Sequence, residues 1–169
     1  MTDQQTLFAE RTTAWLLVLP CSGAGLLALG LLLSMDAQRT LRSSEWWAVP
    51  LTLAIGLMLL VFAVGFRSLG IAITQAQLTF GFPIYRKRFA VADLQGAQER
   101  PYKVLRDFYG WGIRLSPRTG EVGFIAFGSQ GVRIRPLVGR EHTFSCRDPQ
   151  GAIAALSQAG VPIDPPLTP

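Results

Sequence analysis

The side chains that could carry out chemistry are few, and the first to consider are a histidine and a cysteine near the end of the chain. His142 is the only histidine, and Cys146 follows it four positions later. A cysteine nucleophile needs its histidine base within hydrogen-bond reach. The alternating pattern around them predicts a strand, in which residues four apart share a face but are separated by about 13 Å. We therefore predict that they form no nucleophile pair and that the chain has no catalytic residue.

Signatures of metals and cofactors are equally weak. The second cysteine, Cys21, lies in an apolar run far from Cys146, so the sequence has no C-x-x-C motif and no disulfide framework. One histidine, two cysteines and no acidic cluster do not make a zinc ligand set. A formal G-x-G-x-x-A match at residues 23–28 lies inside an apolar run, where small residues predict close contact between two helices instead of dinucleotide binding. The sequence predicts no metal, no cofactor and no enzyme.

The excess of basic residues is the stronger signal. From Arg67 onward the chain has thirteen Lys and Arg and seven Asp and Glu, an excess of six positive charges. Such a region attracts anionic lipid headgroups or nucleic acid. Because apolar segments precede it, we expect headgroups, a protein partner or a second copy of the chain, and no nucleic acid. The candidate contact residues are Arg86, Lys87, Arg88, Lys103, Arg106, Arg133 and Arg135.

Each of these candidates has an alternative interpretation. The triplet at residues 86–88 fits a headgroup contact and a solvated hairpin equally well. Arg133 and Arg135 alternate with core positions, which favours solubility over a partner contact. For Trp111, packing in the core is favoured over a role as a ligand anchor. The longest connection, residues 102–109, is the leading candidate for a partner or lipid site, because loops on a rigid scaffold often carry function.

Two uncharged apolar runs must position these residues. The runs at 12–35 and 46–66 are each long enough for the roughly 20 residues that a bilayer-spanning helix needs. The first run is longer than the apolar core of a signal peptide, and Pro20 fits poorly before a lipoprotein cysteine at Cys21. The two runs, joined by the short polar loop at 36–45, therefore predict a helical hairpin. The polar residues at 1–10 are expected to be frayed.

The distribution of arginines predicts the orientation of this hairpin. The loop carries Arg39 and Arg42, whereas the other side carries Arg11, Arg67 and the triplet at 86–88. Loops and termini that are rich in Lys and Arg stay in the cytoplasm. Both termini are therefore predicted to be cytoplasmic.

The pattern changes after Arg67. Period-two segments broken by Gly and Pro predict about seven antiparallel strands. Asp148 and Pro149 are typical of an N-cap and a first helical residue, and Gly160 of a helix end. Residues 68–160 are thus expected to form a mainly β domain closed by one C-terminal helix, followed by an extended, Pro-rich tail at 161–169.

The order of four motifs carries a resemblance. They are GWGIR at 110–114, GVRI at 131–134, Gly-Arg at 139–140 and the capped helix at 148–156. Over residues 71–160 the chain resembles bacterial pleckstrin-homology (PH)-like membrane proteins, which usually carry two preceding spans. The resemblance implies a PH-like, partly open barrel with a capping helix and a location in the bacterial inner (plasma) membrane. It implies no reaction.

These observations together predict a non-enzymatic, multi-pass integral membrane protein. Its first part, residues 1–67, would form the transmembrane hairpin. Its cytoplasmic PH-like domain would serve protein, lipid-headgroup or self-association. The alternative is an accessory subunit of a membrane enzyme or transporter complex. The sequence indicates neither the ligand nor the oligomeric state.

Overall fold

The computed structural model describes residues 6–14, 18–19, 22–27, 30 and 47–165. The chain divides into two compact units. The first, which we call the β unit, combines Met1–Ala14 with Ser68–Pro169, and the second, the apolar unit, is Trp15–Arg67. The apolar unit is therefore an insertion within the β unit.

The first sheet of the β unit has four antiparallel strands in the order β1-β2-β3-β4. They are β1 (Thr6–Thr13), β2 (Ser68–Thr74), β3 (Gln77–Phe82) and β4 (Tyr85–Ala90). β1 precedes the apolar unit and pairs with β2, so that Thr13 lies beside Ser68. The expectation that these early residues are frayed was wrong for β1, because a partner strand more than fifty residues away supplies its backbone hydrogen bonds.

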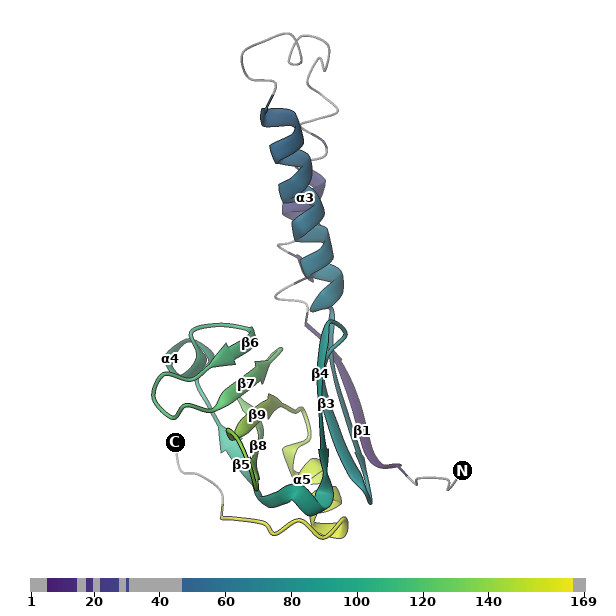
Figure 1. Ribbon diagram of the computed structural model, residues 1–169, viewed down its shortest axis with the longest axis vertical. Coiled ribbons are helices and arrows are strands. Elements are labelled where there is room, and N and C mark those ends of the chain that lie inside the picture. Colours follow the sequence, from purple (N-terminus) through teal and green to yellow (C-terminus); the bar gives the residue numbers. More distant parts are fainter. Residues whose placement is uncertain (1–5, 15–17, 20–21, 28–29, 31–46, 166–169) are drawn as a thin grey trace. The chain divides into compact units, whose positions relative to one another are not determined.

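The second sheet has five strands in the order β5-β8-β9-β7-β6 (Figure 1). They are β5 (Leu94–Pro101), β6 (Gly112–Leu115), β7 (Val122–Ile125), β8 (Gln130–Pro136) and β9 (His142–Ser145). β7 and β9 are parallel, whereas the other pairs are antiparallel. The described residues thus form nine strands instead of about seven antiparallel ones. The sequence prediction missed β5, because the polar and small residues of LQGAQERP do not form an alternation of apolar and polar positions.

A single C-terminal helix closes the β unit, as predicted. α5 (Pro149–Gln158) begins after Asp148, whose carboxylate accepts a hydrogen bond from the Gly151 backbone N–H at 2.8 Å. α5 contacts β1 and β2 of the first sheet and β5 and β8 of the second. The other helices of the unit are short, namely η1 (Val91–Asp93) and α4 (Val104–Phe108).

The two sheets meet at a cluster of phenylalanines. Phe80 of β3 is fully buried and lies 4.7 Å from Phe144 and 5.1 Å from Phe124 between ring centroids. Each such ring contributes about 1.5–3 kcal/mol through the apolar area removed from water. This core fixes β3 and its neighbour β4 relative to β7 and β9.

The apolar unit differs from the predicted hairpin. α3 (Ala48–Gly65) has 18 residues, about 27 Å at 1.5 Å per residue, against a hydrocarbon core of roughly 30 Å. No helix in the described part of the chain is both long enough and apolar enough to cross a membrane. The first predicted span, 12–35, begins inside β1 and is described only in fragments, and the loop at 36–45 lies outside the described residues.

The predicted fold class and its consequences are corrected accordingly. The first described element is a strand of the first sheet, and no N-terminal transmembrane hairpin is found among the described residues. The prediction of a multi-pass protein of the bacterial inner membrane, with both termini cytoplasmic, required two spanning helices, and none is found in the described part of the chain. The alternative of a membrane-complex subunit depended on the same helices and is corrected with it.

Candidate functional site

The clearest candidate site is a groove on the surface of the β unit, with a volume of about 440 Å³. We call it the basic groove, and it is lined by Tyr85, Lys87, Ile113, Val122, Arg140 and His142. These residues come from β4, β6, β7, β9 and the connection between β8 and β9. None of them belongs to the strands on which α5 packs, so the groove lies where the helix leaves the sheets uncovered.

A buried histidine lies at the base of this groove. His142 is 5% exposed, and its ring lies 5.2 Å from Phe89 and 6.1 Å from Phe80 between centroids. Its Nδ1 has no hydrogen-bond partner among the described residues. Burial lowers the pKa of His142 below its ordinary value of 6.5, a hydrogen bond with the Arg140 backbone raises it in part, and the charge of Lys87 lowers it further. The imidazole is therefore neutral at pH 7.

Two cations form the walls. Lys87 is half-buried and Arg140 is exposed, and neither forms an ion pair within the part of the chain that the structure describes. Tyr85 lies beside them, with its ring stacked 6.2 Å from Phe124. The groove thus combines two uncompensated positive charges with aromatic and aliphatic surface.

The basic triplet of the sequence is split between two faces of β4. Successive residues of a strand point to opposite faces. Lys87 lines the basic groove, whereas Arg86 lines a hollow on the other face with Gly70 and Ala72. Arg88 pairs with Thr79, which lines that same hollow. The candidate contact at 86–88 is therefore two separate features, of which only Lys87 reaches the groove.

Arg133 and Arg135 lie in an ion-pair network instead of a contact surface. Glu121 is fully buried, and its carboxylate lies 2.9 Å from Arg100 and 3.3 Å from Arg133. Thr143 donates a further hydrogen bond to it at 2.8 Å. The network continues through two more carboxylates, because Arg133 and Arg135 pair with Glu141 and Arg135 also pairs with Asp164.

The connection at 102–109 is folded rather than open. Tyr102 is buried, and its hydroxyl lies 2.9 Å from the Phe127 carbonyl oxygen and 2.8 Å from Ser145 Oγ. Burial raises the pKa of Tyr102 to about 12, although the Ser145 hydrogen bond opposes this. Trp111 packs against the cluster that contains Tyr102, in agreement with the core interpretation. This end of the connection is structural.

Asp107 holds the remainder of that connection. Its carboxylate accepts hydrogen bonds from the Lys103 backbone at 2.8 Å and from Arg106 Nε at 2.9 Å. Burial alone would raise the pKa of Asp107, but these hydrogen bonds and the charges of Arg106 and Arg100 hold it below its ordinary 3.8. Arg106 is thus engaged with Asp107, whereas the exposed Lys103 lies outside the basic groove.

Cys146 and His142, the two candidates for a nucleophile pair, have different surroundings. Cys146 Sγ lies 3.2 Å from Glu10 of β1, and the same carboxylate accepts hydrogen bonds from the backbone N–H groups of Arg147 and Asp148. Burial first, and then this carboxylate, raise the pKa of the Cys146 thiol. Cys146 therefore helps to join β1 to the start of α5. Among the described residues, no group of three His, Cys, Asp or Glu could hold a metal.

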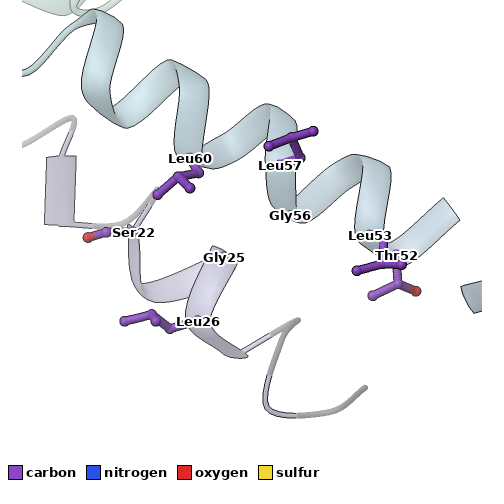
Figure 2. Close-up of a pocket in the computed structure, with 8 residues that line it drawn as sticks. All are labelled: Ser22, Gly25, Leu26, Thr52, Leu53, Gly56, Leu57 and Leu60. Atoms are coloured by element: carbon purple, nitrogen blue, oxygen red, sulfur yellow. The ribbon is translucent and has the colours of Figure 1, made fainter. Parts of the chain in front are cut away.

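The apolar unit contains a second hollow, of about 340 Å³, between residues 22–27 and α3 (Figure 2). Leucines of α3 line it, and a Cβ placed on Gly25 would lie 3.6 Å from the Gly56 carbonyl oxygen. Gly25 thus permits a close approach to α3. The Ser22 hydroxyl donates a hydrogen bond to the Val18 carbonyl oxygen at 2.7 Å. The lining offers no charge for recognition.

Comparison with known proteins leaves the family open. No family model, no curated protein and no solved structure matches this chain. The resemblance to bacterial PH-like proteins stays a prediction, and the site is argued from its geometry alone.

Sequence reasoning found one member of the groove and missed the others. It named Lys87 for its charge, but considered His142 only as a nucleophile's base or a metal ligand, and Arg140 only as part of the Gly-Arg motif. The pleat of β4 was a usable signal, because it separates Lys87 from its two neighbours. Nothing in the sequence indicated that β4 and β6 face one groove.

Proposed function

We propose that the β unit is a non-catalytic recognition module that binds an anionic group of its ligand in the basic groove. Lys87 and Arg140 carry this proposal, because both line the groove and neither has a counter-ion among the described residues. Cations that hydrogen-bond to a carboxylate or phosphate make contacts about twice as strong as neutral ones.

The rest of the lining supports a ligand that is more than a bare anion. Ile113 and Val122 offer aliphatic surface, and Tyr85 offers a ring that is 46% exposed. His142 Nδ1 is buried and has no hydrogen-bond partner among the described residues. A ligand with an anionic group beside an apolar part would match the two cations and this apolar surface.

The single histidine provides a direct test. Its imidazole signals in NMR spectra of the full chain are unambiguous, so a titration with inorganic phosphate can be followed at the base of the groove. We expect a saturable shift of the His142 signals. The double variant Lys87→Ala with Arg140→Ala should bind phosphate about tenfold more weakly or not at all.

A matched control removes the same charge from the other face of β4. The double variant Arg86→Ala with Arg88→Ala also loses two positive charges. Arg86 lines the hollow on the other face of β4, and neither residue lines the groove. It should keep the phosphate response within about threefold. Equal losses in both double variants, or no response in the unmodified chain, would contradict the proposal.

A further inference from the structure

The sheet edges of the β unit differ in what covers them. The tail covers β5: the Ala97 N–H donates to the Pro162 carbonyl at 2.9 Å, and the Asp164 N–H donates to the Ala97 carbonyl at 2.8 Å. Asp164 also pairs with Arg135 of the neighbouring strand. The β unit thus already holds one extended segment on a sheet edge, with backbone hydrogen bonds and an ion pair from its aspartate, Asp164.

The edge of β4 offers backbone hydrogen-bonding groups and charged side chains as well, but no segment of the described chain binds to it. Within the described residues, β4 pairs only with β3, so every second residue presents its backbone N–H and C=O outward. β4 carries three basic residues over six positions. β6, the other strand that borders the groove, has four residues, of which only Arg114 is basic.

We infer that the basic groove binds an extended acidic segment of a partner protein, which adds to the free edge of β4 as a further strand. The inference rests on the proposed function and names its ligand. Addition of a strand to a sheet edge derives affinity from the backbone and specificity from alternate side chains. Basic residues on an edge repel basic strands and accept acidic ones.

Charge selects this occupant over a second copy of the chain. The sequence from Arg67 onward has an excess of six positive charges, so two copies repel each other at this edge. An acidic strand would instead place one set of side chains near Lys87 and Arg140, within the groove. The alternate set would lie near Arg86 and Arg88, on the other face of β4.

The probe is a synthetic peptide of about eight residues, rich in Glu and Asp with one central Val, which is long enough to span β4. Two further versions carry N-methyl groups on alternate residues, one on the odd positions and one on the even positions. Because only every second residue of an added strand bonds to β4, we expect one version to lose about tenfold or more in affinity for the full chain and the other to keep it within about threefold. Equal affinities of the two versions would overturn the inference.

Two further measurements locate the peptide. Backbone amides of β4 should gain protection from hydrogen exchange when it binds, and protection of β6 amides alone would overturn the assignment to β4. The variant Lys87→Ala with Arg140→Ala should weaken the peptide about tenfold, with near-ultraviolet circular dichroism showing that the fold is retained.

The same proteins separate this inference from the proposed function. Phosphate that shifts the His142 signals, together with no binding of the peptide, would leave the function standing and overturn the inference. Exposed apolar residues near the groove, Val138 and Ile84, make a lipid surface the competing occupant. Vesicles of phosphatidylglycerol that bind through Lys87 and Arg140, where the peptide does not, would assign the groove to a headgroup and overturn the inference as well.

Discussion

The β8 side and the β4 side of the β unit both carry closely spaced basic residues, but their surroundings differ. On β8, Arg133 and Arg135 lie among three carboxylates, one of them fully buried. On β4, the residues at 86–88 have no carboxylate within ion-pair distance in the described chain. The cations of β8 are therefore neutralised, whereas those of β4 are unpaired within the described residues.

This difference shows that closely spaced basic residues can have a structural role or remain available for binding. Those on β8 hold strands together, because Glu121 precedes β7 and joins it electrostatically to β5 and β8. Those on β4 hold nothing in the described chain and are available to a ligand. Removing an acid from the first region should therefore cost stability, and removing cations from the second should cost binding.

The largest expected effect is that of Glu121→Ala. It leaves the guanidinium groups of Arg100 and Arg133, which are 13% and 16% exposed, without their shared carboxylate. Breaking a buried ion pair by removing one partner costs about 3–5 kcal/mol in the free energy of unfolding, and we expect about 3 because both arginines reach some water. Urea denaturation of the full chain measures it.

The control for this prediction is Glu99→Ala. Glu99 is a half-buried carboxylate of β5 that forms no ion pair among the described residues. Its loss should change the free energy of unfolding by less than about 0.5 kcal/mol. A similar small change for Glu121→Ala would show that the network does not stabilise the fold.

An intermediate effect is expected from pH, through the histidine below the groove. Because the pKa of His142 is lowered in the folded state, the unfolded chain binds more protons below pH 6.5. The contribution of His142 to the free energy of unfolding should be complete above pH 6.5 and should decrease as the pH falls toward the lowered pKa. Unfolding measured from pH 7 to pH 5 tests this window. The pKa of Asp107 lies below 3.8, so this carboxyl titrates at lower pH than the window.

The variant His142→Phe isolates this contribution. It keeps an aromatic ring against Phe89 and Phe80 but removes the titrating group. Stability should then change much less between pH 7 and pH 5. An unchanged slope would mean that other groups produce the pH dependence.

The smallest expected effect on stability is that of Lys87→Ala with Arg140→Ala. Because neither cation is paired within the described residues, the free energy of unfolding should change by less than about 0.5 kcal/mol. Thermal or urea unfolding of the double variant measures it. A loss above about 1 kcal/mol would show that these residues support the fold, and the contrast between the two regions would disappear.

Several elements could be predicted because their signals are local. Asp148 and Pro149 begin α5 where expected, and Gly139 of the Gly-Arg motif, with its φ of 102°, lies between β8 and β9. The small residues near Gly25 do allow a close approach to Gly56. At the helix start and at Gly139 a few neighbouring residues decide the backbone conformation, and at Gly25 the absence of a side chain decides how closely another helix can approach.

Other elements could not be predicted, because their stabilisation comes from distant parts of the chain. β1 is a strand only because β2 pairs with it across the apolar unit, and the parallel pair of β7 and β9 joins Val122 to His142. The predicted membrane-spanning hairpin was wrong, since no helix in the described part of the chain is long and apolar enough to cross a membrane.

The sequence by itself determined the alternation of the strands, the capped final helix and the excess of positive charge, since these depend on residue type and near-neighbour spacing. Only the tertiary structure decided which cations are neutralised. An ion pair depends on distances of a few ångströms between residues such as Arg100 and Glu121, and such distances are set by how the sheets pack. The same packing left Lys87 and Arg140 together beside His142, without a counter-ion among the described residues.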